Sequence, residues 1–196
     1  MAWHDRNRQD WRRCLFPCIP PRGVGAEIGV WRGDFSTDLL AKTAPDQLHL
    51  VDPWRFQPDP KYADASYGGK LATSQEDMDE LFDLVCRRFA GDGRVVVHRC
   101  TSAEGTGRLA DGSLDWVYLD AEHWYESVRA DIARWAPKVR SGGLVMGDDY
   151  GARGYWGGGV TRAVDEFVAA GGCDVVLLEA NQFALRLNES WPRSSN

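Results

Sequence analysis

The chain has 196 residues, of which 43% are hydrophobic and 27% charged, a balance typical of one globular domain spanning residues 1–196. Its formal net charge is −6. Phosphate neutralisation supplies much of the affinity for nucleic acids, so this charge argues against a nucleic acid as the main partner. No apolar run approaches the ~20 residues that span a bilayer, and the N-terminus lacks a signal-peptide core. We therefore expect a cytoplasmic protein without a membrane partner.

Two smaller features of the composition fit this expectation. The five cysteines are odd in number and scattered, which is typical of reduced thiols in a cytosol. Cys14 and Cys18 could bind a metal as a pair, but no second pair follows, and two small core residues are the preferred interpretation. The only basic cluster is Arg6, Arg8, Arg12 and Arg13, at the start of the chain. Asp5 and Asp10 interrupt it, and we interpret it as a solvated face or helix end.

Short strand-like runs alternate with helical patterns along the chain. This predicts an α/β fold with a mostly parallel sheet and helices on both faces. Strands are predicted at residues 25–30, 47–52, 94–98, 114–120, 144–148, 173–179 and 182–187. Helices are predicted after a cap at Asp34 or Ser36, at 74–89 behind a capping box of Ser74 and Asp77, at 125–135 and at 160–168. The last two strands can pair as a hairpin, which places an antiparallel strand at one edge.

Three segments stand outside this alternation. Residues 1–22 form an N-terminal extension. Residues 53–73 and 151–159 are rich in glycine and aromatic residues, and loops of the first one's length are usually lids or disordered. We expect these two loops to shape an acceptor site, with aromatic side chains from Trp54, Tyr62, Tyr155 and Trp156.

The end of the first strand carries the pattern of a nucleotide-binding turn. Ligands of open α/β sheets bind at the carboxyl ends of the strands, where Gly29 lets the backbone turn and approach a ligand. Gly33 allows close packing where the next helix begins. A dinucleotide would place its pyrophosphate over this turn, and the carboxylate of Glu27 would repel it. S-adenosylmethionine carries an ammonium and a sulfonium instead, so Glu27 favours this cationic cofactor over a nicotinamide one.

Two further residues are candidates for cofactor binding. Asp52 lies 23 residues after Gly29, at the end of the second strand, which is about the spacing of an acidic residue that binds ribose hydroxyls. Its alternative role is a cap before Pro53. Ser102 follows the third strand and is placed to reach the adenine, an assignment that rests on position alone.

Carboxylates end the fourth and fifth strands. Asp120 closes the fourth, and Asp148 and Asp149 close the fifth, so we expect all three at one end of the sheet. Bunched carboxylates stay ionised near a cation, and oxygen ligands suit Mg²⁺. Alternatively, Asp148 and Asp149 point to opposite faces and cap loops. His123 could serve as a general base or a metal ligand, or could simply stack or cap.

Four sequence runs together carry a family resemblance. They are EIGVWRG, VDPW, LDWVYLDAEHWYESVRADIARWAPKVRSGG and LVMGDDY. Over residues 23–170 the chain resembles class I S-adenosylmethionine-dependent methyltransferases with a Rossmann-like sheet. It most resembles the bacterial group that contains the metal-dependent sugar O-methyltransferases of antibiotic biosynthesis.

The resemblance implies roles for particular residues. Glu27 and Gly29 would hold the methionine part of the cofactor, and Asp52 its ribose. Asp120, Asp148 and Asp149 would bind Mg²⁺, with Asp120 also near the cofactor. The expected reaction is methyl transfer to a hydroxyl of a small molecule, with Asp120 and His123 as catalytic residues.

Other activities and assemblies stay open at this point. One alternative is a metal-independent methyltransferase that acts on a carboxylate, a nitrogen or a protein side chain. Another is a non-catalytic cofactor-binding module, because a fold does not dictate a function. The chain is short and lacks the large additions of several such enzymes, which leaves the acceptor and the oligomer contacts open. A homodimer is one of the assemblies considered.

Overall fold

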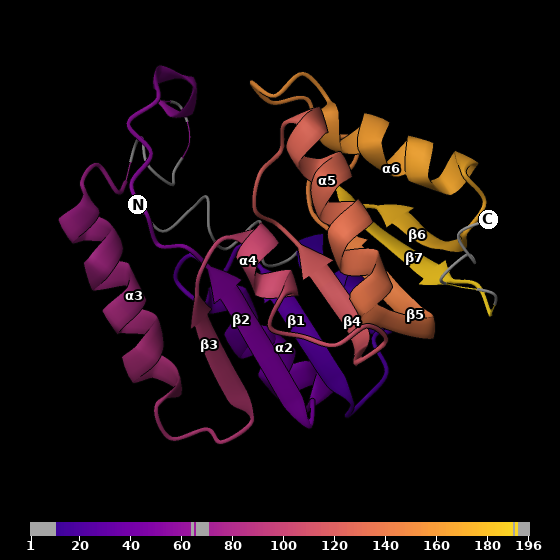
Figure 1. Ribbon diagram of the computed structural model, residues 1–196, viewed down its shortest axis with the longest axis horizontal. Coiled ribbons are helices and arrows are strands. Elements are labelled where there is room, and N and C mark those ends of the chain that lie inside the picture. Colours follow the sequence, from indigo (N-terminus) through magenta and orange to yellow (C-terminus); the bar gives the residue numbers. More distant parts are fainter. Residues whose placement is uncertain (1–10, 64, 66–70, 190, 192–196) are drawn as a thin grey trace.

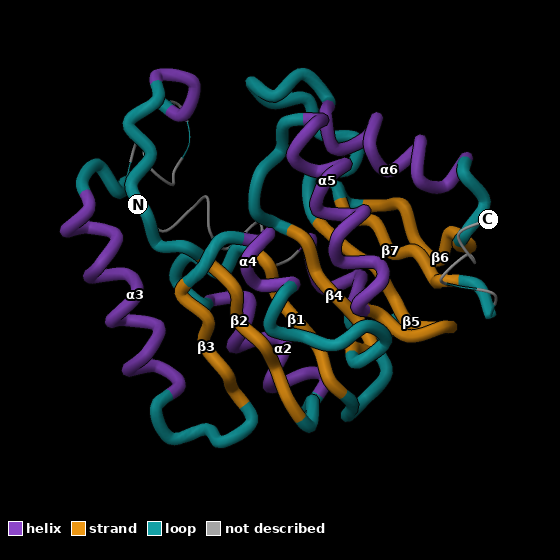
Figure 2. The backbone as a smooth tube through the Cα atoms, viewed as in Figure 1, coloured by secondary structure: helices purple, strands orange, loops and turns teal. Residues whose placement is uncertain are grey.

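The computed structural model describes residues 11–63, 65, 71–189 and 191 (Figures 1 and 2). Seven strands form one sheet in the order β3-β2-β1-β4-β5-β7-β6. The strands are β1 (Val24–Ile28), β2 (Gln47–Asp52), β3 (Val95–Arg99), β4 (Leu114–Leu119), β5 (Val139–Gly147), β6 (Cys173–Glu179) and β7 (Gln182–Leu187). β1 to β5 pair in parallel, and β7 is antiparallel to both of its neighbours. The predicted Rossmann-like sheet is confirmed, with its antiparallel strand next to the edge strand β6.

Helices cover both faces of this sheet, as predicted. They are η1 (Arg13–Leu15), α2 (Asp34–Thr43), η2 (Pro60–Tyr62), α3 (Gln75–Phe89), α4 (Ser102–Thr106), α5 (Tyr125–Trp135), η3 (Ala136–Lys138) and α6 (Gly159–Ala169). One apolar core holds Leu39 of α2 and Met78 of α3 against the sheet, and the other holds Ile132 of α5 and Val164 of α6. In Figure 1, α5 and α6 lie in front of the sheet and α2 lies behind it. Because both faces are buried, the central strands are almost wholly apolar.

Local signals account for where two of the helices begin. The Ser74 hydroxyl accepts a hydrogen bond from the Asp77 amide at 3.1 Å, and the Asp77 carboxylate accepts one from the Ser74 amide at 3.0 Å, so the predicted capping box of α3 is confirmed. Thr101 and Glu104 form the same box at α4. The short helix α4 was not predicted, although this pair is visible in the sequence.

Strand β5 begins five residues before its predicted start. The predicted strand starts only after Ser141, Gly142 and Gly143, because glycine is unfavourable in a strand. In the structure they lie inside the strand, whose pairing with β4 shifts register between Leu114 and Trp116. The shift absorbs the irregular backbone at Gly142, where φ is +72°. β5 therefore starts directly after η3 and still ends where the acidic pair follows.

The two long connections differ from one another. Residues 53–73 contain η2, and residues 64 and 66–70 fall outside the described part. Residues 151–158 contain no helix or strand and lead directly into α6. The hairpin of β6 and β7 is confirmed, and all five cysteines are free. Among the described residues, no helix is long and apolar enough to cross a membrane.

Candidate functional site

The turn after β1 is held in a conformation that needs glycine. Gly29 has φ +92°, and a Cβ there would lie 2.1 Å from the carbonyl oxygen of Asp120. Gly33 has φ +74°, and its Cβ would lie 2.9 Å from the ring of Phe89. The close packing predicted for Gly33 is confirmed, whereas the approach at Gly29 is made to the backbone after β4. The two glycines bring this turn next to the end of β4.

Asp52, at the end of β2, holds the backbone of the same turn. One carboxylate oxygen accepts hydrogen bonds from the amides of Val30 and Trp31 at 2.9 and 3.0 Å. The other accepts one from the amide of Trp54 at 2.8 Å, which is the capping role considered for this residue. The side chain is buried, with 3% of its surface exposed. Its predicted contact with the ribose stays a prediction beside this observed one.

Glu27 lies beneath the turn and is almost completely buried. Its carboxylate accepts a hydrogen bond from the hydroxyl of Ser36 in the first turn of α2. The cap predicted for α2 at Asp34 or Ser36 is therefore wrong: Gly33 is the N-cap residue and no side chain caps the helix. Burial raises the pKa of Glu27 to about 8. A buried carboxyl of this kind is ready to ionise when a cation arrives.

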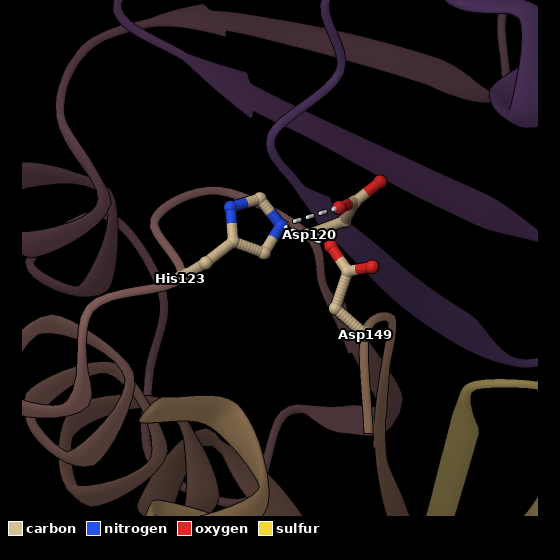
Figure 3. Close-up of side chains that lie close together, drawn as sticks. All are labelled: Asp120, His123 and Asp149. Atoms are coloured by element: carbon tan, nitrogen blue, oxygen red, sulfur yellow. Dashed lines mark ion pairs between the residues drawn. The ribbon is translucent and has the colours of Figure 1, made fainter. Parts of the chain in front are cut away.

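Three side chains converge beyond the ends of β4 and β5 (Figure 3). Nε2 of His123 lies 2.7 Å from Oδ2 of Asp149 and 3.5 Å from Oδ1 of Asp120. One ligand atom from each of the three residues lies within 4.8 Å of the others. Asp149 has φ +64°, a left-handed conformation that aspartate tolerates better than most residues. This conformation turns its carboxylate toward His123.

The charge state of His123 follows from these neighbours. Burial by itself would lower its pKa, but the neighbouring carboxylates of Asp120 and Asp149 raise the pKa of His123 to about 10. At neutral pH the imidazole is therefore a cation between two carboxylates. In this state it has no lone pair with which to act as a general base.

Asp148 belongs to a different set of contacts. Its Oδ2 accepts hydrogen bonds from Arg12, 2.8 Å from Nη2 and 3.2 Å from Nε. Its Oδ1 accepts bonds from the side chain of Gln182 and from the amide of Asp149, the latter at 2.9 Å. The three predicted metal ligands do lie at one end of the sheet. The compact group, however, consists of Asp120, His123 and Asp149, while both oxygens of Asp148 bind other side chains or amides.

Arg12 is the residue at this site that the sequence did not reveal. Of the two interpretations of the basic cluster, the helix end holds for Arg12, which precedes η1, and the solvated face is wrong, because 12% of its side chain is exposed. Its guanidinium also pairs with Asp120 and lies 4.9 Å from the ring centroid of Phe35 and 5.6 Å from that of Tyr118. Arg13 has an exposed position, while Arg6 and Arg8 lie outside the described residues.

Ser102 connects two helices. Its hydroxyl donates a hydrogen bond to Asp131 at 2.6 Å and accepts one from the indole of Trp135 at 2.8 Å, so it joins α4 to α5. Burial raises the pKa of Asp131 to about 6, which reflects how little water reaches this junction. The observed contacts are structural, and the proposed contact with adenine is untested.

The aromatic residues of the two loops have different positions. Trp54 is fully buried and donates a hydrogen bond to the carbonyl of Trp31 at 2.8 Å, so its expected place in an acceptor site is wrong. The hydroxyl of Tyr62 donates to Glu122 at 2.8 Å, close to His123 in the chain. The ring centroid of Trp156 lies 4.8 Å from that of His123. The loop after β5 therefore packs directly on the candidate site.

Comparison with known families decides the class of the protein. The sequence model of a methyltransferase domain family matches residues 26–150, from β1 to the end of the acidic pair. The chain belongs to this methyltransferase family. It is an S-adenosylmethionine-dependent methyltransferase with the class I fold, and the turn after β1 and the group of Asp120, His123 and Asp149 both lie within the matched residues. No curated protein matches this methyltransferase.

Solved structures share the fold of the methyltransferase at low sequence identity. The N-methyltransferase NodS from Bradyrhizobium japonicum is 15% identical over 95% of this chain and 97% of its own, with a TM-score of 0.60. Cofactor-bound Rv0187 from MTB is 20% identical over 96% and 81%, with a TM-score of 0.60. The calicheamicin methyltransferase CalS11 is 19% identical over 94% and 77%, with a TM-score of 0.57. These likenesses concern the fold and leave the methyl acceptor to be argued from the site.

Proposed function

We propose that this methyltransferase transfers a methyl group to a hydroxyl oxygen of a small molecule, assisted by a divalent cation at Asp120, His123 and Asp149. The observation that carries the proposal is the compact group of these three side chains beside the cofactor turn. The carbonyl of Asp120 meets the turn at Gly29, so the carboxylate cluster and the cofactor end of the sheet are contiguous. An acceptor at the cluster would therefore lie next to the cofactor.

The chemistry of the three donors fits a divalent cation. Two carboxylate oxygens and one imidazole nitrogen suit Mg²⁺ or Mn²⁺, and such ions keep further positions for water or substrate oxygens. Protonated His123 now balances part of the charge of Asp120 and Asp149. A divalent ion would take over this role as His123 gives up its proton. When bound, it would supply Lewis acidity that lowers the pKa of an acceptor hydroxyl.

The protein's own residues orient the cofactor and the acceptor and accept the hydroxyl proton. The turn at Gly29 and the buried Glu27 hold the cationic end of the cofactor, and the cluster orients the acceptor oxygen in line with the sulfur. The oxygen–carbon bond forms as the sulfur–carbon bond breaks, and the hydroxyl proton passes to a carboxylate of Asp120 or Asp149. This assignment favours a carboxylate over His123 as the proton acceptor.

The loop after β5 supports a small polyhydroxylated or aromatic acceptor. Trp156 packs on His123, and Tyr155 lies 5.0 Å from Trp156 between ring centroids with 40% of its surface exposed. The indole nitrogen of Trp156 is buried and has no hydrogen-bond partner among the described residues. An aromatic surface with a spare donor suits a sugar or an aromatic ring that carries hydroxyl groups.

The proposal is tested with labelled S-adenosylmethionine and a panel of sugar, catechol, carboxylic acid and amine acceptors. We expect methyl transfer to hydroxyl acceptors that Mn²⁺ or Mg²⁺ stimulates and EDTA suppresses. Replacement Asp149→Asn should lower kcat/KM by about 10²-fold or more, because it removes a ligand and a proton acceptor. The exposed Asp83→Asn serves as the matched control and should keep full activity.

Two results would count against this function. Full methylation of hydroxyl acceptors in EDTA would show that the reaction needs no metal ion, and the enzyme would be a metal-independent methyltransferase. Transfer confined to amine or carboxylate acceptors would remove the oxygen-directed reaction while leaving the methyltransferase itself intact.

A further inference from the structure

Arg12, which directly precedes η1, places a positive charge between the carboxylates of Asp120 and Asp148. Nη2 of its guanidinium binds Asp120 and Asp148 together, and Nε binds Asp148 as well. Asp148 is 136 positions away in the chain, so the contact depends on the complete fold. An arginine guanidinium stays protonated throughout the physiological pH range. The residue is a permanent cation in this place.

The segment that carries Arg12 is firmly packed. Leu15 is fully buried and Ile19 has 4% of its surface exposed, both in the core shared with α2 and α3. The guanidinium also lies against the rings of Phe35 and Tyr118, which fix it further. Arg12 is therefore held in place by a segment that packs into the core.

The oxygens of Asp148 are already engaged. Oδ2 accepts both bonds from Arg12, and Oδ1 accepts bonds from Gln182 and from its neighbouring amide. Asp120 divides its two oxygens: Oδ2 binds Arg12, and Oδ1 faces Nε2 of His123 at 3.5 Å. Oδ1 of Asp120 and Oδ2 of Asp149 thus lie beside Nε2 of His123, whereas Oδ2 of Asp148 is bound to Arg12 and its Oδ1 to Gln182 and a backbone amide.

We propose that Arg12 is the built-in counter-ion of Asp148 and Asp120, and that the cation site excludes Asp148, both of whose oxygens bind other groups. This inference deepens the proposed function, because it names the ligands of the same site. It departs from the ligand set implied by the family resemblance, in which Asp148 and Asp149 act together. Arg12 holds one oxygen of Asp120 and thereby leaves the other toward His123.

The test measures binding of Mn²⁺ alone to the full-length protein by calorimetry and electron paramagnetic resonance. Four variants are compared: Arg12→Gln, Arg12→Lys, Asp148→Asn and Asp149→Asn. We expect Asp149→Asn to weaken Mn²⁺ binding about 100-fold or more, and Asp148→Asn to weaken it less than about tenfold. Arg12→Gln should tighten binding about tenfold, because two carboxylates lose their counter-charge, while Arg12→Lys stays near the wild type. A purely structural role for Arg12 predicts weaker binding in Arg12→Gln.

Circular dichroism and binding of S-adenosylhomocysteine are the controls that each variant is folded. Equal losses in Asp148→Asn and Asp149→Asn would overturn the inference and leave the proposed metal-assisted reaction standing. Unchanged or weaker Mn²⁺ binding in Arg12→Gln would overturn it as well. If neither the wild type nor Arg12→Gln binds Mn²⁺, both the inference about Arg12 and the proposed metal site are wrong. Methyl transfer measured in EDTA then tests whether the protein is a metal-independent methyltransferase.

Discussion

Glu27 is a single residue whose charge we expect to depend on cofactor binding. It is buried beneath the turn at Gly29, and burial raises its pKa to about 8, so the side chain is mostly protonated at pH 7 before the cofactor binds. An ammonium or sulfonium nearby favours the ionised carboxylate and lowers this pKa again. Cofactor binding must then release a proton, and the affinity should rise with pH until the carboxyl is ionised at about pH 8.

Proton release can be measured by titrating S-adenosylmethionine at pH 7 in buffers of different ionisation enthalpy. The wild type should release up to about one proton more than Glu27→Gln, which also subtracts the titration of the ligand itself. Glu76→Gln, at an exposed position of α3, should behave as the wild type. Equal proton release in the wild type and Glu27→Gln would contradict a direct role for Glu27.

The sequence predicts single residues well where a local pattern carries the information. Glu27 lies near the end of the first strand, and Gly29 and Gly33 lie between this strand and the next helix, so their place at the carboxyl end of the sheet could be predicted directly. The environment of Arg12 could not, because its partners Asp120 and Asp148 are distant in the chain. Nothing in a run of arginines and aspartates distinguishes a solvated side chain from a buried one.

At the level of secondary-structure elements, Ser102 joins α4 to α5, whereas the sequence predicts that it contacts the adenine of the cofactor. The hydroxyl of Ser102 donates to Asp131 and accepts from Trp135, so Ser102→Ala would leave two buried polar groups without their partner. We expect this change to lower the free energy of unfolding by about 1–3 kcal/mol. Cofactor affinity should change by less than about threefold, since the observed bonds of this hydroxyl lie between helices.

Chemical denaturation and calorimetry with S-adenosylhomocysteine measure these two quantities. Ser113→Ala removes an exposed hydroxyl that donates to a backbone carbonyl, and it should leave both nearly unchanged. Full stability combined with a large loss of cofactor affinity in Ser102→Ala would instead support the role near adenine that position in the sequence suggests.

The strands and most helices were predictable because their signals are local. Alternation of apolar runs placed all seven strands, and the capping box placed the start of α3. The start of β5 was missed because glycine is unfavourable in a strand, and only pairing with β4 shows that the strand passes through Gly142 and Gly143. Tertiary contacts override local propensity in such places.

At the scale of the whole molecule, the site depends on segments from the full length of the chain. β1 and its turn supply Glu27, the ends of β4 and β5 supply Asp120 and Asp149, and the N-terminal segment supplies Arg12. The order of the strands brings β1, β4 and β5 side by side at the centre of the sheet (Figure 1). A sequence predicts that these ends meet, because parallel strands share one carboxyl edge. It does not predict which of the carboxylates face one another.

The most direct test of this account is a crystal structure of the full chain with S-adenosylhomocysteine and Mn²⁺, with the manganese located by anomalous scattering. We predict the cofactor product at the turn around Gly29 and one manganese peak within bonding distance of Asp120, His123 and Asp149. Asp148 should remain bound to Arg12. A manganese ion bound by Asp148, or a cofactor product away from this turn, would contradict the account.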